Sequence, residues 1–456
     1  RGVFSLLDPM SQHTLSPGQS VEVRVRFAPD RERVYSGLLH VTSTSSNAPY
    51  RRIGLYAVGG AGTLIPAGPV SGAWTKANGP YIVAGDIQVP LGQTLTLEPG
   101  VAVRFAGRFG LTVGRDATLR AVGVERNPIE FSAIDTSEGW LGIRFVSSGD
   151  DDVLQYCRFQ YASKPYAGAA DFVDLLGGAV LCCKGRDPRT GGLTAGPASS
   201  PTIDRCVFSG NHALSGGAIA CHDDSRAVIT NNTITDNTAD WDGGAIHIYN
   251  ADPVIGNNVI ARNLAPYGGS GILLHVSDGT VTLRHNTIAD NGVAEQRMGE
   301  SANQRIGESA MDRVGALVNL TEGDAAGMRY FAGVDDSAQE VPREAQGIMT
   351  VSRVRLNAVN NIIAGHTRGV FELVGGEGTL VFDHTLWYAN TTDADPSVTR
   401  THDVYGDPAF EDAPGGNYRI GPTSAARDAG ASAGVNIDFD GNPRDAHPDI
   451  GAYEYR

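Results

Sequence analysis

Three histidines and a tyrosine recur at matching places in neighbouring segments of this chain. They are His222 in the segment IACH, His247 and Tyr249 in IHIY, and His275 in ILLH. If these segments are adjacent parallel strands with their isoleucines inward, side-chain alternation directs all four residues outward. Imidazoles can act as general acids or bases, and aromatic rings stack on sugars. The pattern therefore predicts a chemically rich patch on an outer face.

Acidic and aromatic residues border this patch, and three interpretations of it stay open. Cys183 precedes His222 in the same outward column, and the bordering residues are Asp223, Asp224, Trp241 and Asp242. The candidate catalytic residues are His222, His247, Tyr249, His275, Asp223 and Asp242, and the candidate carbohydrate-binding residues are Trp241, Tyr249 and Asp224. The patch is a polysaccharide groove, a polar decoration of a solvated sheet, or a place where imidazoles about 5 Å apart share zinc or copper. No metal ligand is assigned.

An internal repeat identifies the elements that must position the patch. Four segments align without gaps and begin at Ile203, Ile229, Ile255 and Leu283, which are 26, 26 and 28 residues apart. Three of these segments precede a double glycine, at Gly216-Gly217, Gly243-Gly244 and Gly268-Gly269. A period in the mid-twenties is that of one β-helix coil, whereas helical solenoid repeats begin at about 33 residues.

Stacked coils require two kinds of repeated position. Inward positions must be apolar, because each side chain lies on its equivalent about 4.8 Å away in the next coil. At one corner the residues Asn232, Asn258, Asn286 and Asn361 fall in register, where amides can bond along the stack and tolerate left-handed backbone. The sequence therefore predicts an all-β chain, a right-handed parallel β-helix with an asparagine ladder.

The predicted β-helix covers residues 63–400 and follows a different N-terminal pattern. Residues 1–62 alternate as short strands do and predict a small, truncated β-sandwich. Insertions are expected near 186–199 and 293–349, the second containing the duplication QRMGESAN and QRIGESAM. Residues 401–456 are expected to form the last coil and a cap.

Three parts of the chain resemble bacterial families. The run LSPGQSVEVRVRFAPD resembles the choice-of-anchor D, or ASH-like, immunoglobulin-fold modules, which implies a spacer. The coils FSGN…GGAI and ITDN…GGAI are similar to repeats of chlamydial polymorphic outer-membrane proteins, and the tail from Gly406 resembles the choice-of-anchor Q ending of β-helix proteins. The tail departs from the usual S-P-A-I-D by reading SAARD. These resemblances imply an extracellular or bacterial cell-surface location, not an activity.

Two functions remain open at this point. One is a secreted or surface β-helix acting as a structural, adhesive or carbohydrate-binding module. The other is a polysaccharide lyase or glycoside hydrolase, since such enzymes carry their groove outside one parallel sheet. A lyase of the pectate type needs a base, but the register puts Arg262 and Arg284 on a different sheet from His247. Hydrolysis needs two carboxylates about 5 to 10 Å apart, which Asp223, Asp224 and Asp242 supply only if a loop folds over the sheet.

The remaining candidates are structural. Cys157 aligns with Cys206 and Cys182 with Cys221, so each pair is either a disulfide or two stacked thiols. The turn Asp438, Asp440, Asn442 carries oxygen ligands of the kind that calcium binds, but Gly441 comes too early for an EF-hand loop, which favours a structural turn. No other cofactor is expected.

Composition limits the partners. The formal net charge is −15, and no cluster of Lys and Arg appears, which excludes nucleic acid as the expected ligand. No 18-residue apolar run is present, so no membrane span is expected within this sequence. A polysaccharide or a cell-surface glycan remains the expected partner.

Overall fold

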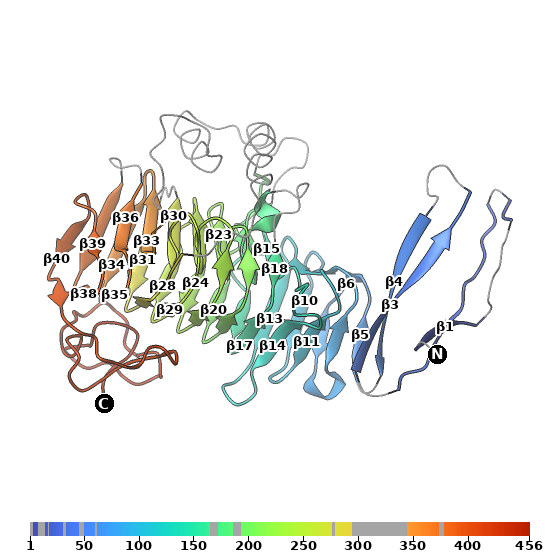
Figure 1. Ribbon diagram of the computed structural model, residues 1–456, viewed down its shortest axis with the longest axis horizontal. Coiled ribbons are helices and arrows are strands. Elements are labelled where there is room, and N and C mark those ends of the chain that lie inside the picture. The colour runs from blue at the N-terminus through green and yellow to red at the C-terminus, as the bar shows by residue number, and fades with distance from the viewer. Residues whose placement is uncertain are drawn as a thin grey trace.

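The chain winds into an elongated stack of coils with three long parallel sheets. The computed structural model describes residues 3–7, 14–16, 18–30, 33–44, 50–59, 62–164, 172–185, 193–275, 279–293, 344–373 and 378–456. The architecture is a right-handed parallel β-helix, as predicted, because successive turns of the chain add one strand to each sheet. Figure 1 shows the coils stacked along the long axis of the molecule.

Each sheet is formed from strands of successive coils. Sheet 1 contains β7 (Gly72–Trp74), β10 (Thr94–Leu97), β13 (Thr118–Val122), β16 (Val153–Gln155), β20 (Thr202–Asp204), β24 (Val228–Thr230), β28 (Val254–Gly256), β31 (Val281–Arg284), β34 (Arg355–Val359), β37 (Thr379–Asp383) and β40 (Thr399–Thr401). Sheet 2 contains β5 (Thr63–Ile65), β8 (Tyr81–Val83), β11 (Ala102–Phe105), β14 (Ile129–Ala133), β17 (Cys157–Gln160), β21 (Val207–Ser209), β25 (Thr233–Thr235), β29 (Val259–Ala261), β32 (Thr287–Ala289), β35 (Ile362–Ala364), β38 (Leu386–Tyr388) and β41 (Val404–Tyr405). Sheet 3 contains β6 (Gly68–Pro69), β9 (Ile87–Val89), β12 (Leu111–Val113), β15 (Ile143–Val146), β19 (Val180–Cys183), β23 (Ile219–His222), β27 (Ile246–Tyr249), β30 (Ile272–His275), β33 (Gln346–Val351), β36 (Arg368–Glu372) and β39 (Thr392–Ala394).

Small elements complete the described chain. A short parallel sheet consists of β18 (Ser163–Lys164), β22 (His212–Ala213) and β26 (Thr238–Ala239). Antiparallel pairs are β1 (Phe4–Leu6) with β2 (Val25–Phe27), β3 (Arg33–Thr42) with β4 (Tyr50–Gly59), and β42 (Phe410–Asp412) with β43 (Asn417–Ile420). Two 3-10 helices are η1 (Lys76–Asn78) and η2 (Phe172–Leu175). The two N-terminal pairs lie at one end of the stack (Figure 1), and the resemblance to an immunoglobulin fold remains a prediction.

The predicted register of the repeat is confirmed. Ile203 pairs with Ile229, Ile229 with Ile255, and Ile255 with Leu283, and all four side chains are fully buried. The hydrophobic core is therefore one continuous column of equivalent side chains. Burying each such side chain stabilises the fold by about 1.5 to 3 kcal/mol relative to its exposure.

The predicted asparagine ladder is confirmed at the corner between sheets 1 and 2. The Nδ2 of Asn232 donates to the Oδ1 of Asn258 at 3.0 Å, and this bond repeats from Asn258 to Asn286 and from Asn286 to Asn361 at 3.0 Å each. Each Oδ1 also accepts the backbone N–H of the preceding asparagine, and the Nδ2 of Asn258 donates to the carbonyl of Ile229. The buried amides therefore have partners along the whole ladder.

A second ladder follows sheet 2. Asn211, Asn237, Asn263 and Asn291 are joined by Nδ2 to Oδ1 hydrogen bonds of 2.9 to 3.0 Å. The next position is His366, whose Nε2 lies 3.4 Å from the Nδ2 of Asn291 and whose backbone N–H donates to Asn390. Burial lowers the pKa of His366 to about 4, against a hydrogen bond with Asn390 that raises it.

The C-terminal segment of the chain packs on the outer face of sheet 2. The segment from Asp407 to the C-terminus packs its own cluster, including Tyr418, Ile450 and Tyr453, against outward residues of sheet 2. Its polar contacts include Tyr418 to Asp290 at 2.9 Å and Arg205 to the carbonyl of Phe439 at 3.1 Å. Figure 1 shows this segment lying beside the coils rather than continuing the three sheets.

Sheet 1 has an open outer face across its described strands. Exposed and half-buried side chains alternate with buried ones along its strands, as in β10 and β34. The exposed members of this face are Thr94, Thr96, Arg120, Val228, Val254, Arg355, Asn357, Thr379, Thr399 and Thr401.

Replacing Asn258 by Ala tests the first ladder. The substitution leaves the buried N–H of Asn232 and the carbonyl of Ile229 without partners, and each costs about 1 to 3 kcal/mol. We expect the free energy of unfolding to fall by about 2 to 5 kcal/mol, measured by urea unfolding. The control Asn357→Ala changes an exposed asparagine and should be neutral. Equal midpoints for both variants would contradict the role of the ladder.

Replacing His366 by Asn tests the second ladder through pH. The folded pKa of His366, about 4, lies below the usual value near 6.5, so the unfolded chain binds a proton first as the pH falls. The contribution of neutral His366 to the free energy of unfolding is complete above about pH 6.5 and is lost as the pH falls toward 4. At pH 5 the loss amounts to about 2 kcal/mol. In His366→Asn this part of the loss of stability at low pH should disappear. The control His447→Asn changes an exposed histidine, so the loss of stability at low pH should be the same as in the parent. An unchanged pH dependence of the urea midpoint in His366→Asn would refute this assignment.

Candidate functional site

The structure brings the predicted histidine patch together in the predicted register. His222 pairs with Tyr249 across β23 and β27, and Tyr249 pairs with His275 across β27 and β30. The rings of His222 and Tyr249 stack with centroids 5.3 Å apart, and those of Tyr249 and His275 lie edge to face at 5.0 Å. The Nε2 of His222 lies 3.4 Å from the Nδ1 of His247. The four residues form one contiguous cluster, the sheet 3 patch.

The expectation that this patch faces solvent is wrong. The exposed fractions of His222, His247 and His275 are 3%, 1% and 2%, and Asp223, Asp242 and Trp241 are also buried. Only Tyr249 is half-buried, and Asp224 is exposed. The interpretation as polar decoration of a solvated sheet is therefore incorrect, and so is the open catalytic groove at these histidines.

Glycine turns explain part of the burial. Gly216 and Gly243 have φ of 67° and 60°, which favour glycine. A Cβ added to Gly216 would lie 3.0 Å from the Cβ of His247, and one added to Gly243 would lie 3.2 Å from it. The double glycines therefore place backbone directly against the outer face of sheet 3.

Apolar residues continue this buried face on both sides of the patch. The outward column runs Leu181, Ala220, His247, Leu273, Met349 and Phe371. Leu181 and Ala220 belong to one small buried cluster, and Leu273, Met349 and Phe371 belong to another, both separate from the main interior. From β19 to β36 the outer face of sheet 3 is therefore a second core, and the patch lies in its middle.

The electrostatics of the patch suit a neutral, buried cluster. Burial lowers the pKa of His247 well below its usual value, and the neighbouring His222 and His275 lower it further. Burial raises the pKa of Asp242 to about 7, and a hydrogen bond with Ser215 partly opposes this effect. Both shifts favour the uncharged form of the group, and an uncharged imidazole or carboxyl costs less free energy to bury than a charged one.

An open depression lies beside Asp224, at the border of sheet 3 and sheet 1. It has a volume of about 550 Å³, and its polar lining comes from Asp150, Ser200, Thr202, Asp224 and Arg226. The Nζ of Lys184 lies 3.2 Å from the carboxylate of Asp224. Of the predicted site residues, Asp224 alone reaches this depression.

The other candidates from the sequence occupy structural places. Arg284 lies in sheet 1, and Arg262 follows β29 of sheet 2 and forms an ion pair with Asp236 at 2.7 Å. Neither arginine therefore lies on the same sheet as His247. Asp438 accepts a hydrogen bond from the backbone of Asn442 at 2.7 Å, and Asp440 pairs with Arg419. The turn at residues 438–442 is thus held by contacts within the fold. The duplication beginning at Gln296 lies outside the described residues.

All five cysteines are buried and present as free thiols. Cys182 pairs with Cys221 in adjacent strands, and the backbone N–H of Cys157 donates to the Sγ of Cys206 at 3.4 Å. Burial raises the pKa of Cys157 and of Cys182 well above the usual value. Of the two alternatives, the structure contains the stacked thiols.

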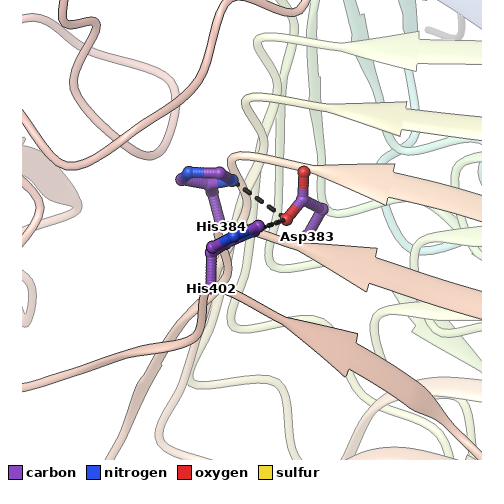
Figure 2. A group of neighbouring side chains, drawn as sticks. All are labelled: Asp383, His384 and His402. Atoms are coloured by element: carbon purple, nitrogen blue, oxygen red, sulfur yellow. Dashed lines mark hydrogen bonds and ion pairs between the residues drawn. The ribbon is translucent and has the colours of Figure 1, made fainter.

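A group that sequence reasoning missed can hold a metal ion. Within the described ranges, Asp383, His384 and His402 are the one set of three whose ligand atoms all lie within 4.8 Å of one another (Figure 2). The three histidines of the sheet 3 patch do not form such a set. Burial raises the pKa of Asp383, but hydrogen bonds with His402 and Thr401 and the charge of His384 outweigh it, so the pKa is lowered. The sequence signal that could have identified these histidines is the repeat itself. His384 and His402 occupy, in the last two coils, the position that Asn231 and Asn257 occupy in earlier coils.

A family model agrees with the architecture over part of the chain. The family model described as "Right handed beta helix region" matches residues 175–308. The solved crystal structure of pectate lyase Pel9A is similar over 81% of this chain and 89% of that chain, with 11% sequence identity and a TM-score of 0.33. A likeness of this extent carries no argument about activity. No curated protein sequence matches this chain significantly. No helix in the described part is long and apolar enough to cross a membrane.

Replacing Gly243 by Ala tests the glycine cover. The new Cβ would lie 2.8 Å from the carbonyl of Ile246 at a φ of 60°. Left-handed strain of about 1 to 2 kcal/mol plus the clash should lower the urea midpoint clearly. The control Gly256→Ala has ordinary backbone and no neighbour closer than 3.5 Å, so its midpoint should stay near that of the parent. Equal tolerance of the two substitutions would show that the turn does not press on sheet 3.

Proposed function

We propose that this chain is a structural and glycan-binding module of a secreted or cell-surface protein. The single observation that supports the proposal is the unequal cover of the three sheets. The chain's own residues bury the outer face of sheet 2 from β29 to β35 and that of sheet 3 from β19 to β36, whereas the described strands of sheet 1 have exposed or half-buried outward residues along the length of the sheet. A rod with one free polar face is suited to lie along an extended partner. The depression at Asp224 opens beside this face.

The lining of the depression favours a neutral polysaccharide. Carboxylates at Asp150 and Asp224, the guanidinium of Arg226 and the hydroxyls of Ser200 and Thr202 provide both acceptors and donors for sugar hydroxyls. Two carboxylates outnumber the one arginine of the lining, and the whole chain has a formal charge of −15. A polyanionic glycan would be repelled by this charge. We therefore take neutral glycans as the ligand class.

A polysaccharide-cleaving enzyme is the second candidate, now placed at the depression. Glycoside hydrolysis uses two carboxylates on opposite sides of the bond, and Asp150 and Asp224 line the same space. The buried histidines of the sheet 3 patch give no support to a lyase or hydrolase that would use them, because a polymer cannot reach them. Product formation distinguishes this candidate from simple binding.

Binding to immobilised neutral and acidic polysaccharides tests the proposal. In Arg226→Ala and Asp224→Asn we expect affinity for a neutral glycan to fall about 10-fold to 100-fold, because each loses a charged hydrogen-bonding group worth about 1.5 to 3 kcal/mol. The control Arg158→Ala changes an exposed arginine of sheet 2, away from both the sheet 1 face and the depression, and should bind as the parent does.

Two outcomes decide between the candidates. Absence of binding to every polysaccharide, or equal binding by all variants, would refute the glycan module. New reducing ends or unsaturated products, lost in Asp150→Asn, would replace the binding module by the enzyme.

A further inference from the structure

The corner between sheets 1 and 2 carries a column of left-handed residues. Asn231, Asn257, His285, Asn360, His384 and His402 occupy it, with φ between 47° and 58°. Asn, Asp and His tolerate this conformation better than most residues. In the last two coils the column therefore presents two imidazoles on adjacent turns.

Three side chains converge at this corner. Asp383 ends β37 and pairs with Thr401 of β40, so His384 and His402 follow directly after paired strands. The imidazoles stack with ring centroids 4.6 Å apart. Figure 2 shows both rings facing the carboxylate of Asp383, with dashed lines to the same oxygen. The Nδ1 of His402 lies 2.7 Å from the Oδ1 of Asp383, and the Nδ1 of His384 lies 3.0 Å from the same oxygen.

His384 faces the same carboxylate oxygen as His402. Its Nδ1 is buried and lies 3.0 Å from the Oδ1 of Asp383, within the range of an ion pair. The backbone N–H of His384 donates to the carbonyl of Thr401 at 3.0 Å, which fixes the residue in place. A metal ion that takes the place of the proton between this nitrogen and the carboxylate would be bound by both groups, which are common zinc ligands.

We infer that Asp383, His384 and His402 form a binding site for a divalent transition-metal ion of the zinc class. Two ligand atoms about 2.1 Å from one zinc ion are about 3.4 Å apart at the tetrahedral angle. The two nitrogens lie 2.7 and 3.0 Å from the carboxylate oxygen, so each pair would have to separate by less than about 1 Å to hold the ion. Two imidazoles with one carboxylate suit zinc, copper, nickel or iron, whereas calcium and magnesium prefer oxygen ligands. Three protein ligands leave coordination positions for water or for a ligand atom.

The position of the site explains what a bound ion would do to the fold. His384 lies in the penultimate coil and His402 in the last one, so one ion would join the two turns at the end of the stack. The side chain of His402 is 68% exposed, so an ion can enter from solvent. This inference does not depend on glycan binding, because the site lies outside the lining of the depression.

Metal titration of the full chain tests the inference. After removal of metals with a chelator, isothermal titration calorimetry with Zn²⁺ should show one saturable site, and Ca²⁺ and Mg²⁺ should show none there. Co²⁺ should give d–d absorption without cobalt–thiolate bands. In His402→Ala and in Asp383→Asn the Zn²⁺ affinity should fall more than about 100-fold, beyond the 10-fold to 100-fold typical of indirect partners.

A matched histidine provides the control. His447 is exposed and distant in sequence, so His447→Ala should keep the parent affinity. Slower hydrogen exchange of residues 399–405 with Zn²⁺, absent in His402→Ala, would support the joining of the last two coils. Unchanged Zn²⁺ affinity in His402→Ala and Asp383→Asn, thiolate bands with Co²⁺, or no saturable Zn²⁺ binding by the parent would overturn the site.

Discussion

The whole structure depends on one geometric constraint: each coil must satisfy the groups that its neighbour buries. Equivalent apolar side chains lie on one another, and equivalent amides donate and accept along the stack, as at Asn232, Asn258 and Asn286. An unpaired buried amide or backbone group costs free energy comparable to a lost hydrogen bond. A coil therefore tolerates variation in length between corners, such as the 28-residue step to Leu283, but not a shift of register within its strands.

The same constraint separates positions that maintain the fold from positions that are free to vary. Inward columns and ladders are fixed by stacking, whereas outward columns depend on what covers them. On sheet 3 the cover turns the outer face into a second core, so a histidine such as His247 must be neutral to lie there. On sheet 1 the described outer face lacks such a cover, and polar side chains of any kind can be presented to a partner. The surface that is free for binding is thus a consequence of which sheets the chain covers.

The sequence predicted what local repetition determines. The register of Ile229 and Ile255, the ladder through Asn361, and the adjacency of Cys182 and Cys221 all follow from counting residues between equivalent positions. The composition of the sheet 3 patch was predicted for the same reason. Its burial was not, because the cover comes from the backbone at Gly216 and Gly243 and from apolar columns whose contacts a repeat does not reveal. The packing of Tyr418 against sheet 2 is likewise a contact between segments far apart in the sequence.

The metal-capable corner shows how a regular fold can carry chemistry without disturbing its core. The left-handed column requires only a residue that tolerates positive φ, so an asparagine in one coil and a histidine in another leave the backbone unchanged. His285 uses this freedom in the middle of the stack, where burial and the charge of Arg444 lower its pKa to about 3 and its Nε2 lies 2.9 Å from the amide of Asn360. At the end of the stack His402 occupies the same position with a side chain that is 68% exposed, so an ion can reach it from solvent. Cover, not backbone geometry, therefore decides whether a corner histidine acts as a structural group or as a ligand.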